Sequence, residues 1–185
     1  MVSVDNNLKS LYIDGKPVRK ASLGGKVFFE KMEAEGHLIF NGQTFTTSSS
    51  SSGFTGSDIV IDWGDGSTTN YVDKNSLNHT YATEGEYAIT LIGNITSLGE
   101  GCFYDCSGLT SVVIPDSVTS LGAGCFASCS MLTSVVLNWE TDIPTYDSTW
   151  FRDSPISELS IPEGTLQDYI DAGYPSDKLV ERGGE

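Results

Sequence analysis

Basic residues are scarce in this chain, which has 10 Lys and Arg against 25 Asp and Glu among its 185 residues, for a formal net charge of −15. A surface this acidic repels phosphate backbones, so no nucleic-acid partner is expected. Long apolar runs are also missing. Because a spanning helix needs roughly 20 apolar residues, no membrane span is expected. Residues 1–7 have neither a basic start nor an apolar stretch, so no secretory signal is expected either.

Motifs of catalysis and cofactor binding are absent as well. The sequence has no G-x-x-x-x-G-K-[ST] or G-x-G-x-x-G loop for phosphates and no G-x-S-x-G nucleophile elbow. His37 and His79 are its only histidines. Asp62 and Asp65 could form a carboxylate pair or hold calcium, but an aspartate next to Gly66 is typical of a tight turn. We therefore expect no catalytic residue, no cofactor and no metal, in a protein that is not an enzyme.

The few basic residues are concentrated near the N-terminus. Residues 1–33 carry six basic and four acidic residues, a net charge of +2, whereas the remainder carries four basic and 21 acidic residues, a net charge of −17. This asymmetry predicts that residues 1–33 face a different partner from the rest of the chain. The alternative is that the acidic charge only keeps the rest of the chain in solution.

Residues 8–31 are predicted to form a small β-meander. Apolar residues 11–13 precede an Asp-Gly dipeptide, which suits the type I′ turn of a hairpin. A Gly-Gly dipeptide at 24–25 precedes a last strand at 26–29. About 25 residues cannot bury a stable core alone, so this piece must dock on the rest of the chain, on a second copy or on another protein. The candidate anchor residues are Tyr12, Lys16, Arg19, Lys20, Lys26 and Phe28.

Residues 34–94 show strand patterns on both sides of five consecutive serines, which are expected to form a loop. Ile59, Ile61 and Trp63 alternate along one predicted strand. An Asp-Trp-Gly-Asp-Gly turn begins at residue 62, His-Thr-Tyr follows at residue 79, and a Gly-x-Tyr-x-Ile-x-Leu strand begins at residue 85. In this order the motifs resemble those of a PKD-type immunoglobulin-like domain. The resemblance implies a β-sandwich in which His79 is a strand residue with a structural hydrogen bond.

From residue 95 the sequence repeats itself at a constant offset, so that position 95 corresponds to position 118. The pattern [IV]-T-S-L-G begins at both of these positions, and L-T-S-V-V-[IL] begins at positions 109 and 132, with the same offset. A third, less regular copy places Phe151 in the position of Phe126. A unit this short cannot bury its apolar face alone, so equivalent turns are expected to stack with like residues on like.

The repeat closely resembles the BspA-type leucine-rich repeat, with its consensus G-x-x-x-F-x-x-C-x-x-L-x-x-V-x-I-P, over residues 95–162. The resemblance implies a short solenoid of about three repeats over residues 95–164. A predicted short helix and a last strand over residues 165–185 resemble the helical C-terminal cap of such arrays. Because only residues 92–94 separate the sandwich from the first repeat, the sandwich is expected to cap the other end.

Each of the first two repeats carries a C-x-x-x-C pair, formed by Cys102, Cys106, Cys125 and Cys129. Four thiolates could make a tetrahedral zinc site, and disulfides are a second possibility. The repeat register favours a third interpretation, in which Cys102 stacks near Cys125 and Cys106 near Cys129 as buried free thiols. The alternatives stay open on the sequence alone.

Aromatic residues gather around the irregular third repeat, and aromatic side chains are enriched in binding hot spots. They are therefore candidates for a ligand or partner surface. The alternative is that they fill packing positions, since Tyr146 aligns with leucines of the first two repeats. The four candidates are Trp139, Tyr146, Trp150 and Tyr174.

The fold class predicted from these patterns is mainly β: an N-terminal β-meander, a PKD-like sandwich, a leucine-rich-repeat solenoid and a helical cap. Residues 11–27 also resemble a short module of bacteriophage tail and other virion proteins. This resemblance implies a non-enzymatic virion protein, a phage tail, baseplate or capsid accessory, that binds other virion proteins through residues 1–33. Its acidic repeats would present a surface to a host protein or glycan, and an oligomer is possible.

Two other functions are compatible with the sequence. The first is a cell-surface adhesin module of a gut bacterium, because the same repeats are common in such proteins; it would act outside the cell and would need export. The second is an accessory domain of a glycan-active enzyme. Tail or capsid genes beside this one would separate the virion protein from the adhesin.

Overall fold

The computed structural model describes residues 36–47, 51–72 and 77–183, together with the backbone of residues 2–4, 11–13, 16–17, 22–23 and 26–27. The chain divides into two compact units, residues 1–33 and residues 34–185.

The first unit contains five short strands in two sheets. The strands β1 (Val2–Val4), β2 (Leu11–Ile13) and β3 (Lys16–Pro17) form an antiparallel sheet in that order. The strands β4 (Ser22–Leu23) and β5 (Lys26–Val27) pair separately as an antiparallel hairpin. The predicted strand at 11–13 is confirmed, but β1 was not predicted and the strands form two small sheets where one meander was expected. The predicted turns at 14–15 and 24–25 lie outside the described residues.

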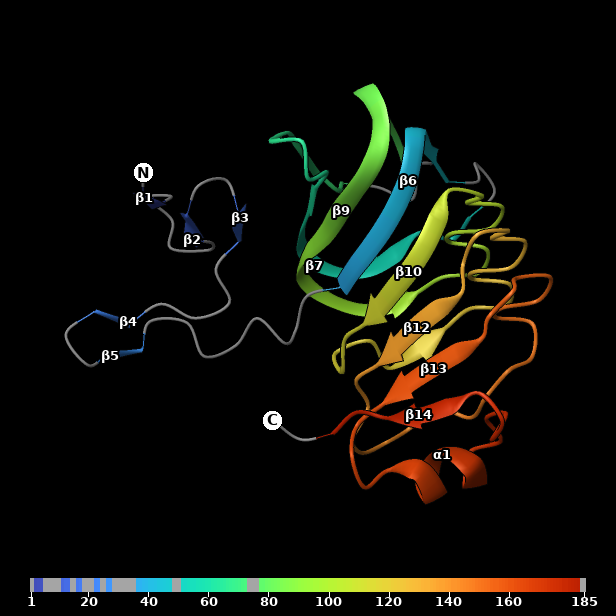
Figure 1. Cartoon of the computed structure of the whole chain (residues 1–185). Coiled ribbons are helices and arrows are strands. Elements are labelled where there is room, and N and C mark those ends of the chain that lie inside the picture. The colour runs from blue at the N-terminus through green and yellow to red at the C-terminus, as the bar shows by residue number, and fades with distance from the viewer. Residues whose placement is uncertain are drawn as a thin grey trace. The chain divides into compact units, whose positions relative to one another are not determined.

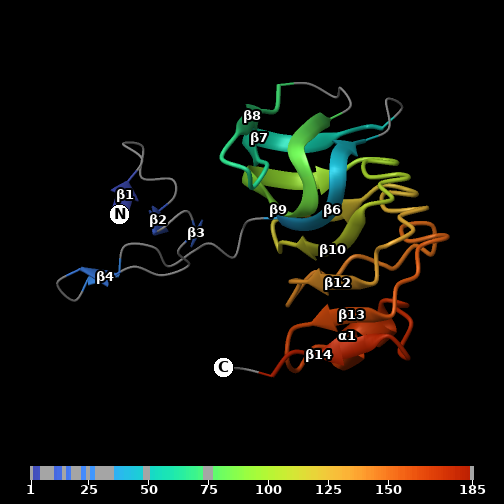
Figure 2. The same cartoon turned by 45° about the horizontal axis from the view of Figure 1, so that its top comes forward.

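The second unit is built around one continuous sheet (Figures 1 and 2). Its strand order is β14-β13-β12-β10-β6-β9-β7-β8, and the short β11 pairs with β9 off this path. In chain order the elements are β6 (Gly36–Thr46), β7 (Phe54–Asp62), β8 (Thr68–Asn70), β9 (Asn78–Leu98), β10 (Leu109–Ile114), β11 (Ser120–Leu121), β12 (Ser134–Leu137), β13 (Glu158–Ile161), α1 (Leu166–Asp171) and β14 (Leu179–Glu181).

A β-solenoid of about four turns forms the C-terminal part of this unit. Its strands β10, β12, β13 and β14 are parallel and lie one below another in Figure 1. Val112 pairs with Val135, and Val135 pairs with Leu159, so the predicted stacking of like on like is confirmed. Because the strand pleat turns alternate side chains to one face, these columns form the apolar interior of the solenoid.

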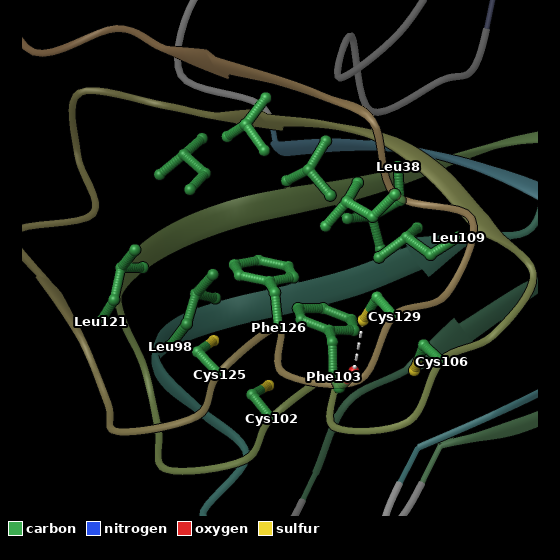
Figure 3. Packing of buried hydrophobic residues seen from close by; sticks show 14 of the residues in the cluster. Leu38, Leu98, Cys102, Phe103, Cys106, Leu109, Leu121, Cys125, Phe126 and Cys129 are labelled. Atoms are coloured by element: carbon green, nitrogen blue, oxygen red, sulfur yellow. Dashed lines mark hydrogen bonds between the residues drawn. The ribbon is translucent and has the colours of Figure 1, made fainter. Parts of the chain in front are cut away.

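Phenylalanines stack along the opposite wall of the solenoid interior. The rings of Phe103 and Phe126 lie 5.1 Å apart with planes 9° from parallel (Figure 3). Phe151 continues the stack 5.7 Å from Phe126, as its predicted position requires. Each ring is buried, and offset stacking at such spacings is favourable beyond the area it removes from water.

The strand β9 joins the solenoid to the segment before it. It pairs with β6 up to Leu91, with β7 from Thr90 to Leu98, and with β11 through Ser97 and Leu98. It therefore runs through the position between residues 94 and 95 where a boundary was predicted. In addition, β6 pairs with β10 in antiparallel orientation. This pairing protects an edge that the first solenoid strand would otherwise expose, and joins β6–β9 and the solenoid strands in one sheet.

The core is continuous across the same junction. Phe45 and Phe54, from β6 and β7, lie 6.5 Å and 5.6 Å from Phe103 of the first repeat, measured between ring centroids. All three side chains are buried. The segment before the repeats thus packs directly against the end of the phenylalanine stack.

Threonines and a serine of the repeated T-S pattern hold successive coils together. In each case the hydroxyl group donates a hydrogen bond to a backbone carbonyl of the preceding coil or strand. The pairs are Thr96 with Thr55, Thr110 with Ile39, Thr119 with Thr96, and Ser157 with Thr133, at 3.1–3.2 Å.

The short helix and the last strand expected near the C-terminus are present as α1 and β14. A Glu181 carboxylate oxygen accepts hydrogen bonds from the backbone N–H groups of Gly164 and Leu166, at 2.8 and 3.1 Å. The Arg182 guanidinium donates to the carbonyl oxygens of Leu137 and Ile161. Within the described residues, no helix has the length and apolarity that crossing a membrane requires.

Candidate functional site

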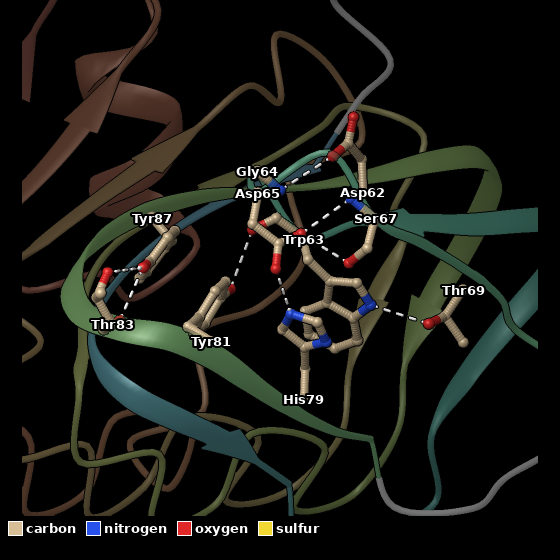
Figure 4. Close-up of polar contacts among 10 residues, drawn as sticks. All are labelled: Asp62, Trp63, Gly64, Asp65, Ser67, Thr69, His79, Tyr81, Thr83 and Tyr87. Carbon is tan, nitrogen blue, oxygen red and sulfur yellow. Dashed lines mark hydrogen bonds and ion pairs between the residues drawn. The ribbon is translucent and has the colours of Figure 1, made fainter.

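The two aspartates that could have formed a carboxylate site serve a tight turn (Figure 4). Asp62 Oδ1 accepts a hydrogen bond from the backbone N–H of Gly64 at 2.9 Å. Asp65 Oδ1 accepts from the backbone N–H of Ser67 at 2.9 Å and from its hydroxyl at 2.6 Å. The Ser67 hydroxyl bond is the main reason that the pKa of Asp65 is lowered to about 2. The interpretation of both residues as turn chemistry is confirmed.

His79 lies on β9 beside this turn. Its ring stacks on Trp63, with centroids 4.5 Å apart and planes 7° from parallel, and its Nε2 lies 2.8 Å from Asp65 Oδ2. The indole N–H of Trp63 donates to Thr69 Oγ1 at 2.9 Å, and the Tyr81 hydroxyl donates to the carbonyl oxygen of Trp63 at 3.0 Å. The prediction of a strand histidine with a structural hydrogen bond is confirmed.

All four cysteines are buried free thiols in this structure, as the repeat register predicted. Burial raises the pKa of the Cys106 thiol, and that of the Cys129 thiol to about 12, so both stay protonated at neutral pH. Their S–H groups donate to backbone carbonyl oxygens, Cys106 to Thr46 at 3.4 Å and Cys129 to Phe103 at 3.1 Å. Within the described residues, no three His, Cys, Asp or Glu side chains are grouped as metal ligands.

The four aromatic candidates do not form an exposed surface. Trp139, Trp150 and Tyr174 are only 2%, 4% and 3% exposed, so they cannot stack on a ligand from solvent. The indole N–H groups of the two tryptophans donate to backbone carbonyls within the interior, at 2.6 and 3.0 Å. Tyr146 is half-buried, with its ring 5.0 Å from that of Tyr174. The prediction of a binding surface is corrected for the three buried residues, and the packing interpretation fits them.

The candidate anchor residues lie in the first unit. Tyr12 is in β2, Lys16 in β3 and Lys26 in β5. The other three, Arg19, Lys20 and Phe28, lie outside the described residues. Nothing is described of the side chains in this unit, so the anchor stays a prediction.

A groove of about 400 Å³, which sequence reasoning missed, lies where the repeats meet β6. One wall is the bulged part of β6, with its register shift between Gly42 and Thr44. The other wall is made by turns of the first two coils, including Asp105 and Ser130. Gly108 allows the close approach, because a Cβ there would lie 2.4 Å from the carbonyl oxygen of Asn41.

Six exposed polar side chains line this groove, together with the half-exposed Met131. Within the described residues none of the six makes a hydrogen bond or an ion pair with another side chain or the backbone, in contrast to the hydroxyl groups that join the coils. Asp105 carries the only formal charge among them, and its backbone has a positive φ of 60°. The six are Asn41, Thr44, Thr46, Asp105, Ser107 and Ser130.

The coil geometry defines a class of protein: a β-solenoid of stacked short repeats with one parallel strand each, of which the first three place a phenylalanine on the opposite wall. Residues 70–171, more than half of the chain, match the sequence profile described as "BspA type Leucine rich repeat region", in six copies. The chain belongs to this family. The match begins before the expected start at residue 95 and includes β9, in agreement with the pairing of that strand with both parts of the sheet.

Comparisons with curated proteins and with solved structures found no match. The family assignment alone indicates a surface or adhesion-type repeat module.

Proposed function

We propose that this protein is a non-catalytic adhesion module that holds a glycan or protein of a host surface in the groove between β6 and the first two coils. The observation that carries the proposal is the set of six polar side chains directed to one concave surface and left free to bind. By contrast, the hydroxyl groups of Thr96, Thr110, Thr119 and Ser157 bind backbone carbonyls. In concave sites a small number of polar groups fix the orientation of a ligand, and Phe40, Phe45 and Met131 add apolar lining to this one.

The chemistry of the groove favours a neutral, hydroxyl-rich ligand such as an oligosaccharide. Hydroxyl, amide and carboxylate groups exchange hydrogen bonds with sugar hydroxyls. Sialylated or sulfated glycans are disfavoured, because residues 34–185 carry a net charge of −17 and the lining contains Asp105 but no basic residue. Salt therefore has little effect on the expected binding.

An oligosaccharide array tests this proposal. The full chain should be retained on neutral glycans and not on sialylated or sulfated ones, and it should leave bound glycans uncleaved over hours. Retention on acidic glycans alone, or turnover of the glycan, contradicts the proposal. Retention on host proteins that carry no glycan would still support an adhesion function, but the ligand would then be a protein.

We further propose that residues 1–33 attach the module to a larger assembly, of which a virion is the first candidate. Support comes from their separate compactness, their charge of +2 beside a body of −17, and the resemblance of residues 11–27 to a phage virion module. The cell-surface adhesin remains the second candidate, since the family assignment fits it equally well.

Both ends of the solenoid require capping structures, because an unpaired terminal coil exposes apolar surface and strand edges. We propose that residues 34–94 descend from a PKD-type sandwich and cap the first coil. The turn at residues 62–66 and its contact with the His79 ring support this origin. At the other end, α1 and β14 are proposed to act as the C-terminal cap.

A further inference from the structure

Cys102 and Cys125 occupy the same position in the first two coils, each directly before the stacked phenylalanine. Backbone hydrogen bonds hold the two coils in register on both sides of this pair. Gly101 N–H donates to the Ala123 carbonyl oxygen at 3.0 Å, and Phe103 N–H donates to that of Cys125 at 2.7 Å. Backbone segments joined by such hydrogen bonds lie about 4.8 Å apart, as neighbouring strands do, which is within the range of about 4.4–6.8 Å that Cα atoms span in disulfides.

The side chains of this pair also lie beside each other. Figure 3 shows Cys102 and Cys125 on adjacent turns with their sulfur atoms pointing the same way. Besides burial, a side-chain hydrogen bond with Cys102 raises the pKa of the Cys125 thiol. The two sulfur atoms are thus partners within the folded chain.

The second cysteine pair, Cys106 and Cys129, differs in the direction of its thiol groups. Cys106 and Cys129 also occupy equivalent positions of the first two repeats. Their S–H groups, however, are directed at carbonyl oxygens, those of Thr46 and Phe103. Each sulfur is therefore held by the backbone and not by the other sulfur.

We propose that Cys102 and Cys125 form a disulfide when the protein folds in an oxidising environment, and that Cys106 and Cys129 stay reduced. In the reaction two S–H bonds are lost and one S–S bond forms between the coils. The two electrons and two protons pass to a small-molecule disulfide, such as oxidised glutathione, which becomes two thiols. Because Cys102 and Cys125 are 2% and 0% exposed, the bond forms while the coils dock and is shielded afterwards.

The cross-link has a consequence for the groove. The walls contributed by the repeats come from the same two coils, with Asp105 in the first and Ser130 in the second. A bond between these coils fixes the spacing of the two walls and stabilises the fold by restricting the unfolded chain.

The test is refolding of the full chain from denaturant, once in reductant and once in a mixture of reduced and oxidised glutathione, followed by alkylation and peptide mapping. The expected product of the second arm has one disulfide, between Cys102 and Cys125, and two alkylated thiols, Cys106 and Cys129. Its melting temperature should exceed that of the reduced protein by about 5–10 °C. Four alkylated thiols, or a Cys106–Cys129 bond in comparable yield, would overturn the proposal.

Cysteine-to-serine variants distinguish the contributions of the two cysteine pairs. A Cys106→Ser/Cys129→Ser double variant should retain the rise in melting temperature, whereas Cys102→Ser should abolish it. If a variant fails to fold, the peptide map of the unmodified chain still decides the outcome. An oxidant-dependent rise that persists in Cys102→Ser contradicts the assignment.

Discussion

Cys129 and Ser154 occupy the same position in successive coils and perform the same task. The Cys129 thiol donates to the carbonyl oxygen of Phe103 at 3.1 Å, and the Ser154 hydroxyl donates to that of Phe126 at 2.7 Å. Each acceptor is the stacked phenylalanine of the coil before. Cys106 is the equivalent residue of the first coil. Its thiol donates to the carbonyl oxygen of Thr46 in β6, which lies where a preceding coil would lie. The repeat position thus calls for a small side chain with a hydrogen-bond donor.

Substitution of Cys129 tests this role. Cys129→Ala removes the thiol donor, leaves the Phe103 carbonyl oxygen with only the Cys106 N–H at 3.3 Å and opens a small cavity, so we expect it to lower the free energy of unfolding by about 1–3 kcal/mol. Cys129→Ser should cost less, because a hydroxyl performs the same task at Ser154. Chemical denaturation of both variants measures the difference. A larger loss for serine than for alanine would contradict the donor role.

The glycines of the turn at residues 62–66 should respond differently to substitution. Both have a positive φ, 78° at Gly64 and 90° at Gly66. A Cβ at Gly64 would lie 2.5 Å from the Ala88 carbonyl oxygen, whereas a Cβ at Gly66 would meet nothing within 4 Å. We expect Gly66→Ala to cost about 1–2 kcal/mol through backbone strain alone. Gly64→Ala should cost about 3 kcal/mol or more. Equal losses in thermal or chemical unfolding would show that the turn does not pack on β9.

Asp65 should make the stability depend on acidic pH. Its folded-state pKa of about 2 lies below the ordinary value of 3.8. A lowered carboxyl pKa stabilises the fold above the unfolded-state value, and this contribution is lost as the pH falls from about 4 towards 2. Unfolding free energies measured across this range should fall more steeply for the natural chain than for Asp65→Asn. Parallel curves would mean that Asp65 makes no such contribution.

Removal of residues 1–33 tests the proposed anchor. The remaining chain, residues 34–185, contains a complete core and sheet, so we expect it to fold with a melting temperature within a few degrees of the full chain. Its co-sedimentation with the larger assembly should be abolished. Unfolding of the truncated chain would show that these residues belong to the core of the body. Unchanged folding together with unchanged co-sedimentation would refute the anchor completely.

The repeats could be predicted from the sequence because their register recurs at a constant offset and like residues stack on like. The pairing of β6 with β10 could not, since it joins segments that lie far apart in the chain and share no pattern. The groove depends on that pairing and on the fit of Gly108 against β6. The burial of Trp139 could not be predicted from the sequence either. Its indole N–H donates to the Val118 carbonyl oxygen, and only the folded coils bring these two groups together.

The central claim is that the groove binds a neutral glycan, and the dissociation constant of Asp105→Asn tests it most directly. Asparagine tolerates the positive φ of this position, so the fold should be preserved while the carboxylate acceptor is lost. The matched control is Asp153→Asn, because Asp153 has nearly the same φ, 61°, at the equivalent turn of the third coil, away from the groove. With a neutral glycan selected on the array, calorimetry should show binding weakened about tenfold or more by Asp105→Asn and unchanged by Asp153→Asn. Equal affinities for the natural chain and both variants would contradict the claim.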